Sequence, residues 1–487
     1  MLKNVLVQLI KTFQRKEMTR FWEFAQSPYH NKHQDVKALV AYLNQIYPNF
    51  SEETCNRQTI FQRLFPNKKH DQAKLALLFT YTRRLVEQFL ILERSGEESI
   101  ANQLLLLRDL RQRKQYKYYE RAMRQINEQQ NEARYRDGDY FRQQFLAASE
   151  ANSFYGQLSQ HKMDDSLQRK QNHLDHYYLS EKLRDACEML VRSRILKVEH
   201  STGLLDMVLR QVEAQAEEYL SVPAISIYYQ LYQLILTKDQ QRYEDLVGIL
   251  DHSAQWFPKG ELQNIYHYLQ NYCIEQINKG SRGALEAAFE LYKKQLTLGL
   301  LTDDDNYLSE WHYKNIVTIG LRLEEQEWIR WFLEDYRQQL RPESAENAYC
   351  FNLATYHYSK GQYDEVLELL LRLEHSDIRY QLDSKAMLLR TYYDLDEYEA
   401  FLSLVDAFQQ FIHRNKLISD FQRRGYAHLL KFARRAFRIK NNIDLVKRSK
   451  SRAALQQLTE RVEATRPIYN LSWLNGQIDK MRDLVVD

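Results

Sequence analysis

No proline interrupts this chain between Pro66 and Pro223. Proline lacks the backbone donor that a helix needs and clashes with the preceding turn, so a long tract without it favours continuous helices. Glycine is also scarce, with 13 residues in a chain of 487, against ordinary usage of about 7%. Leu, Gln, Arg, Glu and Lys are abundant, and all are good helix formers. The sequence therefore predicts an all-α fold of helices joined by short loops.

The first part of the chain, residues 1–97, carries apolar residues at helical spacing, as in Val36, Leu39 and Leu43. Asp71 stands where an N-cap would start a further helix. We expect an N-terminal helical domain here, either capping the rest of the chain or acting as a separate interaction module.

Residues 98–222 are predicted to form long, polar-rich helices. One unbroken helix is expected over residues 101–137, ending at Asp137 and Gly138, and another over residues 165–197. Sustained apolar heptads are missing from both, which argues against a coiled coil.

From Pro223 onward the chain shows a recurring pattern. The aromatic residues Trp328, Tyr363 and Tyr398 are spaced 35 residues apart, each five residues after another large apolar or aromatic side chain. This period is typical of helix hairpins stacked into a solenoid, which we predict for residues 223–465, followed by a tail over 466–487. An irregular helical bundle is the alternative. Gly361 suits a hairpin turn that needs a positive φ.

The stretch "NLATYHYSKGQYDEV" resembles a tetratricopeptide repeat (TPR). Its matching residues are Leu353, Ala354, His357, Tyr358, Gly361 and Tyr363. Cys350 stands where the family uses Trp, and the next copy has Asp396 in place of the turn Gly and Phe401 in place of Ala.

The resemblance implies a concave groove that holds a peptide or a helix of a partner protein. Carried over to this chain, the family's groove positions predict partner contacts at Phe351, Asn352, Thr355, Tyr358, Arg390 and Tyr393. Asn352 matches the Asn with which some TPR domains hold a C-terminal carboxylate. Met387 and Val317 stand at the equivalent positions of the neighbouring copies, so a complete carboxylate clamp is not expected.

Positive charge is concentrated near the C-terminus. Residues 413–452 contain thirteen Lys and Arg residues against Asp420 and Asp444, a local net charge of +11, while the whole chain carries +3. Six of these residues are predicted to form a basic ridge on the protein surface: Arg423, Arg424, Lys431, Arg434, Arg435 and Arg438. Such a ridge suits nucleic-acid phosphates or an acidic protein surface, and a solvated final helix pair is the structural alternative.

Catalytic motifs are absent from the sequence, so neither an enzyme nor a cofactor is expected. The pairs His30/His33 and His173/His176 have the spacing of two metal ligands but lack further ligands nearby, which favours surface or capping roles and no metal. The "TDDDNY" loop is expected to cap the next helix.

Four widely spaced cysteines and the lack of a long apolar run predict a reduced, cytoplasmic protein without a membrane span. We therefore expect a protein–protein interaction scaffold, with a nucleic-acid-associated factor as the alternative. The oligomeric state is left open.

Overall fold

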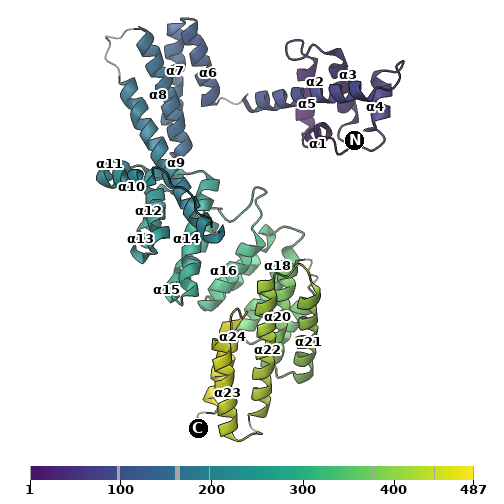
Figure 1. Cartoon of the computed structure of the whole chain (residues 1–487), viewed down its shortest axis with the longest axis vertical. Coiled ribbons are helices and arrows are strands. Elements are labelled where there is room, and N and C mark those ends of the chain that lie inside the picture. The colour runs from purple at the N-terminus through teal and green to yellow at the C-terminus, as the bar shows by residue number, and fades with distance from the viewer. Residues whose placement is uncertain are drawn as a thin grey trace. The chain divides into compact units, whose positions relative to one another are not determined.

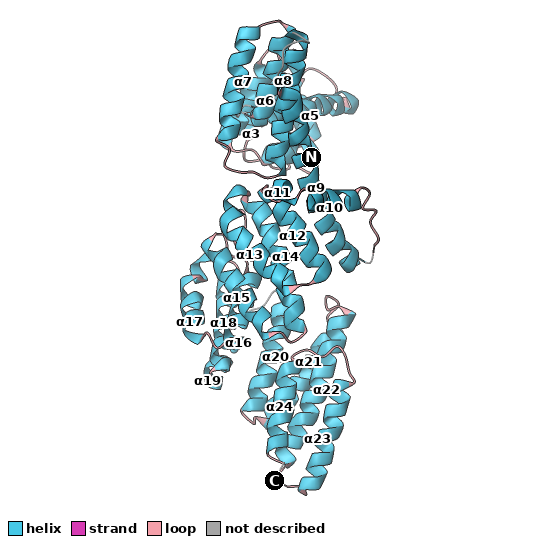
Figure 2. Cartoon of the chain, turned by 90° about the vertical axis from the view of Figure 1, so that its left-hand side faces the viewer, coloured by secondary structure: helices cyan, strands magenta, loops and turns pink. Residues whose placement is uncertain are grey.

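The computed structural model describes residues 2–95, 99–158, 165–196, 198–373, 377–443 and 445–485. These residues form twenty-four α-helices and no β-strand, which confirms the all-α prediction (Figures 1 and 2). The chain divides into two compact units, Met1–Tyr232 (unit 1) and Gln233–Asp487 (unit 2). The division falls inside α12 (Pro223–Thr237), whose first residue is the predicted start of the repeats. The boundary predicted between residues 97 and 98 lies outside the described residues.

Unit 1 begins with five helices that share one apolar core. They are α1 (Val5–Lys11), α2 (Arg15–Gln26), α3 (Gln34–Ile46), α4 (Arg57–Leu64) and α5 (Gln72–Ser95). Phe21 lies at the centre of this core, with its ring 5.3 Å from that of Phe89 and 5.9 Å from that of Phe13. The Lys74 N–H donates to Asp71 Oδ1 at 2.9 Å, so Asp71 caps α5 as predicted.

A second group of helices completes unit 1. It comprises α6 (Ile100–Gln112), α7 (Tyr116–Asn131), α8 (Gly138–Leu158), α9 (Ser166–Leu196), α10 (Leu205–Ala214) and α11 (Ala216–Tyr219). Helix α9 confirms the predicted helix over 165–197. The single helix predicted over 101–137 is wrong, because Lys114 adopts a φ of 59° and reverses the chain between α6 and α7. Asp137 accepts from Tyr140 N–H at 2.9 Å and so starts α8 instead of ending a helix.

Unit 2 consists of consecutive helices, and from α14 onward each packs on its chain neighbours. After α12 they are α13 (Gln240–Ser253), η1 (Ala254–Trp256), α14 (Lys259–Asn278), α15 (Arg282–Thr297), α16 (Glu310–Arg322), α17 (Gln326–Asp335), η2 (Arg337–Gln339), α18 (Ala345–Ser359), α19 (Tyr363–Leu371), α20 (Ile378–Asp394), α21 (Tyr398–Arg414), α22 (Asp420–Asn442), α23 (Arg448–Glu463) and α24 (Leu471–Asp483). The first helices of neighbouring hairpins also touch, α16 with α18 and α18 with α20.

Three hairpin turns of unit 2 share one backbone geometry. Glu324, Gly361 and Asp396 all adopt a positive φ, of 64°, 71° and 59°. The next N–H donates back across the helix end, from Gln362 to His357 O at 3.0 Å and equivalently in the other two turns. This is the Schellman pattern of helix termination.

In two of these three hairpins the second helix begins at the predicted aromatic residue. Helices α19 and α21 begin at Tyr363 and Tyr398, as expected. Helix α17 begins at Gln326, before Trp328, so the 35-residue spacing of the aromatic residues does not mark its start.

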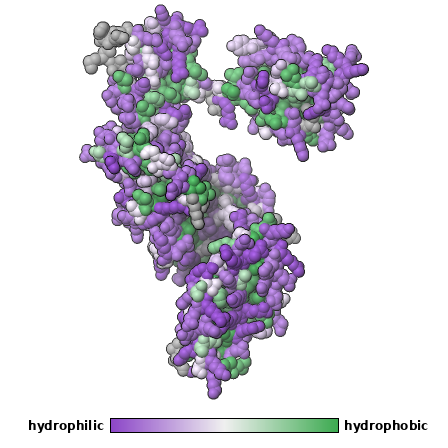
Figure 3. Space-filling view, in the orientation of Figure 1, coloured by the Kyte–Doolittle hydropathy of each residue, from purple (hydrophilic) through white to green (hydrophobic). Residues whose placement is uncertain are grey.

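The expected C-terminal tail over 466–487 contains a packed helix. Leu474, Ile478 and Met481 of α24 are buried in the same core as residues of α20 to α23. The prediction of a tail is therefore wrong for this segment. Figure 3 shows one face of each unit. On both units this face is mostly hydrophilic, with small scattered apolar patches.

The turn geometry predicts that a Gly→Ala substitution changes the free energy of unfolding in opposite directions at two positions. Gly361→Ala adds a Cβ that meets no atom but forces a non-glycine residue to a φ of 71°, so it should lower the free energy of unfolding, by about 1 kcal/mol. Gly476→Ala lies within α24, also in open space, and should raise it by about 0.5–1 kcal/mol because alanine favours a helix. Urea denaturation of the full chain measures both, and shifts of equal sign would contradict the turn assignment.

Candidate functional site

Three of the predicted groove residues are packing residues in the folded chain. Asn352 and Tyr393 are fully buried, and Phe351 is 4% exposed. The Asn352 amide donates to Ala348 O at 2.8 Å within its own helix, and its Oδ1 has no hydrogen-bond partner among the described residues. The prediction that these three side chains line an open groove is wrong, because α16, α19 and α20 all pack around α18.

Tyr393 is covered by the C-terminal helix. The Trp473 ring of α24 meets the Tyr393 ring edge-on at 5.2 Å, and the Tyr393 O–H lies 4.0 Å from Met481 Sδ. Lys440 Nζ donates to the Tyr393 carbonyl at 3.1 Å. Sequence reasoning missed this cover because it treated the last residues as a tail.

The other three predicted groove residues, Thr355, Tyr358 and Arg390, are half-buried. The Arg390 guanidinium lies 4.6 Å from the Tyr358 ring centroid, and the Tyr358 O–H donates to Asp394 Oδ2. Gln477 of α24 donates to Asp394 Oδ1 at 2.8 Å. Burial raises the pKa of Tyr358, which keeps its hydroxyl protonated as a donor. We call these residues, Thr355, Tyr358, Arg390 and Asp394, the inner cluster.

A second polar cluster links α16, α20 and α22. Lys314 Nζ pairs with Asp383 Oδ2, and the Tyr426 O–H donates to Asp383 Oδ1 at 3.1 Å. The Lys314 ammonium also lies over three rings, at 5.6 Å from Trp311, 5.3 Å from Phe351 and 5.7 Å from Tyr380. No sequence pattern could reveal this pairing, since Lys314 and Asp383 are 69 residues apart.

The predicted basic ridge divides into two kinds of residue. Arg423 turns inward, where its guanidinium donates to four carbonyls at the end of α21 and after it, including His413 O at 3.2 Å and Ile418 O at 3.1 Å. Arg434 pairs with Asp406 at 3.0 Å. Arg424, Lys431 and Arg438 are exposed, and Arg435 is half-exposed with its guanidinium on Gln457 Oε1.

Two open hollows flank the exposed part of the ridge. The larger, of about 580 Å³, lies between α21 and α22 and is lined by Lys431, Arg434, Arg435 and Arg438 among others. The smaller, of about 310 Å³, lies between α22 and α23 and includes Lys450. Arg435 and Arg438 line both hollows.

The histidine pairs and the acidic loop take structural roles. His30 stacks on Phe24 with ring centroids 4.2 Å apart, and His176 packs edge-on against Phe141 at 5.2 Å. Asp303 and Asp305 pair with Arg341 at 2.6 and 2.8 Å. Ser309, not one of the aspartates, caps α16, so the capping prediction for that loop is wrong. Within the described ranges, no three His, Cys, Asp or Glu side chains form a group that could hold a metal ion.

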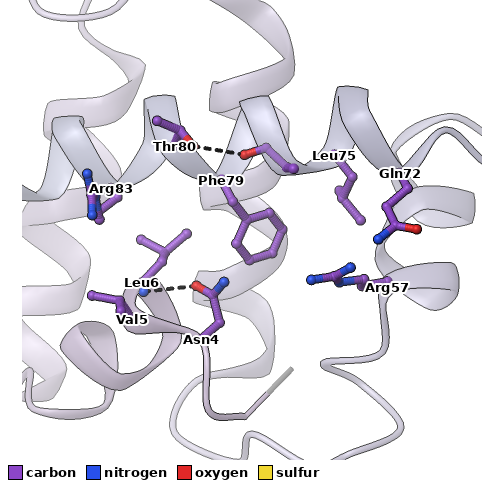
Figure 4. Close-up of a pocket in the computed structure, with 10 residues that line it drawn as sticks. Asn4, Val5, Leu6, Arg57, Gln72, Leu75, Phe79, Thr80 and Arg83 are labelled. Carbon is purple, nitrogen blue, oxygen red and sulfur yellow. Dashed lines mark hydrogen bonds between the residues drawn. The ribbon is translucent and has the colours of Figure 1, made fainter.

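Unit 1 carries a further pocket of about 240 Å³ between α1, α4 and α5. Figure 4 shows the Phe79 ring pointing into it, with Arg57 and Arg83 at opposite ends. Its lining combines apolar side chains with two arginines, a mixture that suits contact with a small molecule or with another chain.

Comparison with known protein families, curated proteins and solved structures gives no match for this chain. Among the described helices of this chain, none is both long enough and apolar enough to cross a bilayer.

The contacts of neighbouring arginines predict different stability effects. Arg423→Ala removes a charged group that satisfies carbonyls at a helix end, and should lower the free energy of unfolding by about 2 kcal/mol. Arg424→Ala changes an exposed residue, and should stay within about 0.5 kcal/mol of the parent protein. Denaturant unfolding of the two variants checks this, and equal destabilisation would show that Arg423 is not a structural residue.

The half-buried histidines of α9 predict a dependence of stability on pH. Burial lowers the pKa of both His173 and His176. The unfolded chain therefore binds protons more readily, so this contribution is complete above the ordinary histidine pKa and is lost as the pH falls below it. His176→Phe keeps the ring contacts and should flatten the fall in melting temperature between neutral pH and about pH 5. Parallel curves for variant and parent would contradict the assignment.

Proposed function

We propose that this protein is a non-enzymatic scaffold for protein–protein interaction, whose second unit is a TPR-like solenoid that holds a peptide or a helix of a partner. The repeated turns at Glu324, Gly361 and Asp396 support stacked hairpins. So do the contacts of α18 with both α16 and α20, since each hairpin of a solenoid packs on its neighbours.

The observation that carries the binding role is the inner cluster. It brings a tyrosine and an arginine together half-buried on the first helices of two hairpins, with Arg390 over the Tyr358 ring at 4.6 Å. Tyr and Arg dominate the binding energy of protein interfaces, because they combine large contact area with directed hydrogen bonds. An extended or helical peptide would contact Thr355, Tyr358 and Arg390, while the buried Phe351, Asn352 and Tyr393 hold the surface in place.

The cysteines are consistent with a cytoplasmic scaffold. All four are free and buried, and burial raises the pKa of Cys273 to about 11. Thiols of this kind persist where the surroundings are reducing.

The inner cluster predicts which substitutions abolish partner binding. Affinity capture with the full chain from extracts of its native cell, followed by mass spectrometry, should recover a stoichiometric protein. Thr355→Arg places a charge and added bulk beside Tyr358, and Arg390→Ala removes the guanidinium, so each should reduce recovery about tenfold or more. The matched control, Leu371→Arg, adds the same charge at a 73% exposed position on the outer helix α19 and should leave recovery unchanged.

Recovery of one partner by parent and control but not by the two cluster variants, at equal melting temperature, would support the proposal. Equal recovery by all four proteins, or no stoichiometric partner, would refute this surface as the binding site.

A further inference from the structure

One face of α22 carries a continuous stripe of six residues. Phe421, Arg424, His428, Lys431, Arg435 and Arg438 follow one another at intervals of three and four residues, which places them on one side of a helix. The opposite side, including Tyr426, Leu430 and Phe437, is buried in the core of unit 2. The stripe is therefore the outward face of α22, although Arg435 is half-buried and His428 is half-buried against Pro467 O at 2.8 Å.

The charge of this stripe is not neutralised by carboxylates of the described residues. Arg424, Lys431 and Arg438 form no ion pair with any described carboxylate. Three carboxylates that contact α22 are engaged by other groups, Asp406 by Arg434 at 3.0 Å, Asp396 by Lys440 at 2.6 Å and Asp383 by Lys314. Asp420, at the start of α22, lies 4.0 Å from Arg423. The exposed cations of the α22 stripe are therefore not paired with any described carboxylate.

The hollows on either side give the stripe a concave setting. Arg435 and Arg438 line both hollows, Lys431 lines the larger, and Lys450 of α23 lines the smaller. Cations gathered around a concave surface raise the local potential and attract anions over a longer range than cations scattered on a convex one.

We propose that the α22 stripe binds the phosphate backbone of a nucleic acid. From Arg424 to Arg438 the helix rises about 21 Å, which matches about six nucleotides stacked at the spacing of a duplex strand. Contacts to phosphate need cations and no apolar anchor. This function is separate from the proposed protein scaffold, because it uses another helix and none of the inner cluster.

The composition of the stripe favours a nucleic acid over an acidic protein. Protein partners draw most of their binding energy from apolar or aromatic anchors near the interface centre. The centre of this stripe is His428 and Lys431, and its exposed aromatic residue, Phe421 at 57% exposure, lies at one end. An aromatic ring beside a row of cations is the arrangement that stacks a base while the backbone is held.

Salt-dependent binding to the full chain tests the proposal. Fluorescence anisotropy would use a labelled single-stranded RNA long enough to span the stripe, and a DNA duplex of equal length. Four phosphate contacts to a single strand should weaken affinity about 50-fold between about 50 and about 200 mM salt. Arg435→Ala with Arg438→Ala should halve the slope of log affinity against log salt, and Arg424→Ala with Lys431→Ala should do the same.

Two controls separate the stripe from general charge and from folding. Arg282→Ala with Lys480→Ala removes the same charge from exposed positions on α15 and α24 and should leave the slope unchanged. The melting temperature of each variant should equal that of the parent. Phe421→Ala should weaken binding of the single strand about tenfold and spare the duplex, and an unchanged affinity for both would remove base stacking from the proposal.

Several results would overturn the proposal. They are no binding at low salt, binding that both stripe variants retain in full, and binding of labelled polyglutamate as tight as that of RNA, which would point to an acidic protein partner. The inner-cluster variants of the capture experiment should bind RNA normally, so failure of either proposal can be told from failure of the other.

Discussion

Three hairpins of unit 2 each depend on one residue that leaves the first helix in the left-handed conformation. At Gly361 and Asp396 the chain turns with a positive φ, and the following N–H returns to a carbonyl of the last helical turn. The turn satisfies helix-end carbonyls and starts the second helix within two residues. Because the second helix must return along the first, both can bury a shared apolar face, and α18 also contacts α16 and α20.

The polar surfaces of unit 2 differ in how their charges are compensated. On the inner helices, Lys314 pairs with Asp383, while Asp394 accepts from both Tyr358 and Gln477. These groups link α16, α18, α20, α22 and α24, while Thr355, Tyr358 and Arg390 stay half-buried. On α22, by contrast, the cations outnumber the available carboxylates. The inner cluster therefore suits a partner with matched polar groups, and the α22 stripe suits a polyanion.

Several features of the fold followed from local sequence. The all-α fold, the cap at Asp71, the turn at Gly361 and the starts of α19 and α21 depend on residues close together in the chain, and each was predicted. The turn at Lys114 escaped prediction because lysine carries no signal for a positive φ, and packing of Tyr119 on Phe154, with rings 3.8 Å apart, stabilises it from a distance.

The candidate sites also divide into features that local sequence predicted and features that only the tertiary structure revealed. Spacing along one helix placed Lys431, Arg435 and Arg438 together, because residues three and four apart share a face whatever surrounds the helix. Only the tertiary structure turned Arg423 inward, buried Asn352 and covered Tyr393 with Trp473. Helix propensity, caps and the charge of a single helix act over a few residues and were determined by the sequence alone. Packing between segments far apart in the chain decided which face of each helix stays exposed. That packing determines how much apolar surface is removed from water, and it cannot be read from one helix alone.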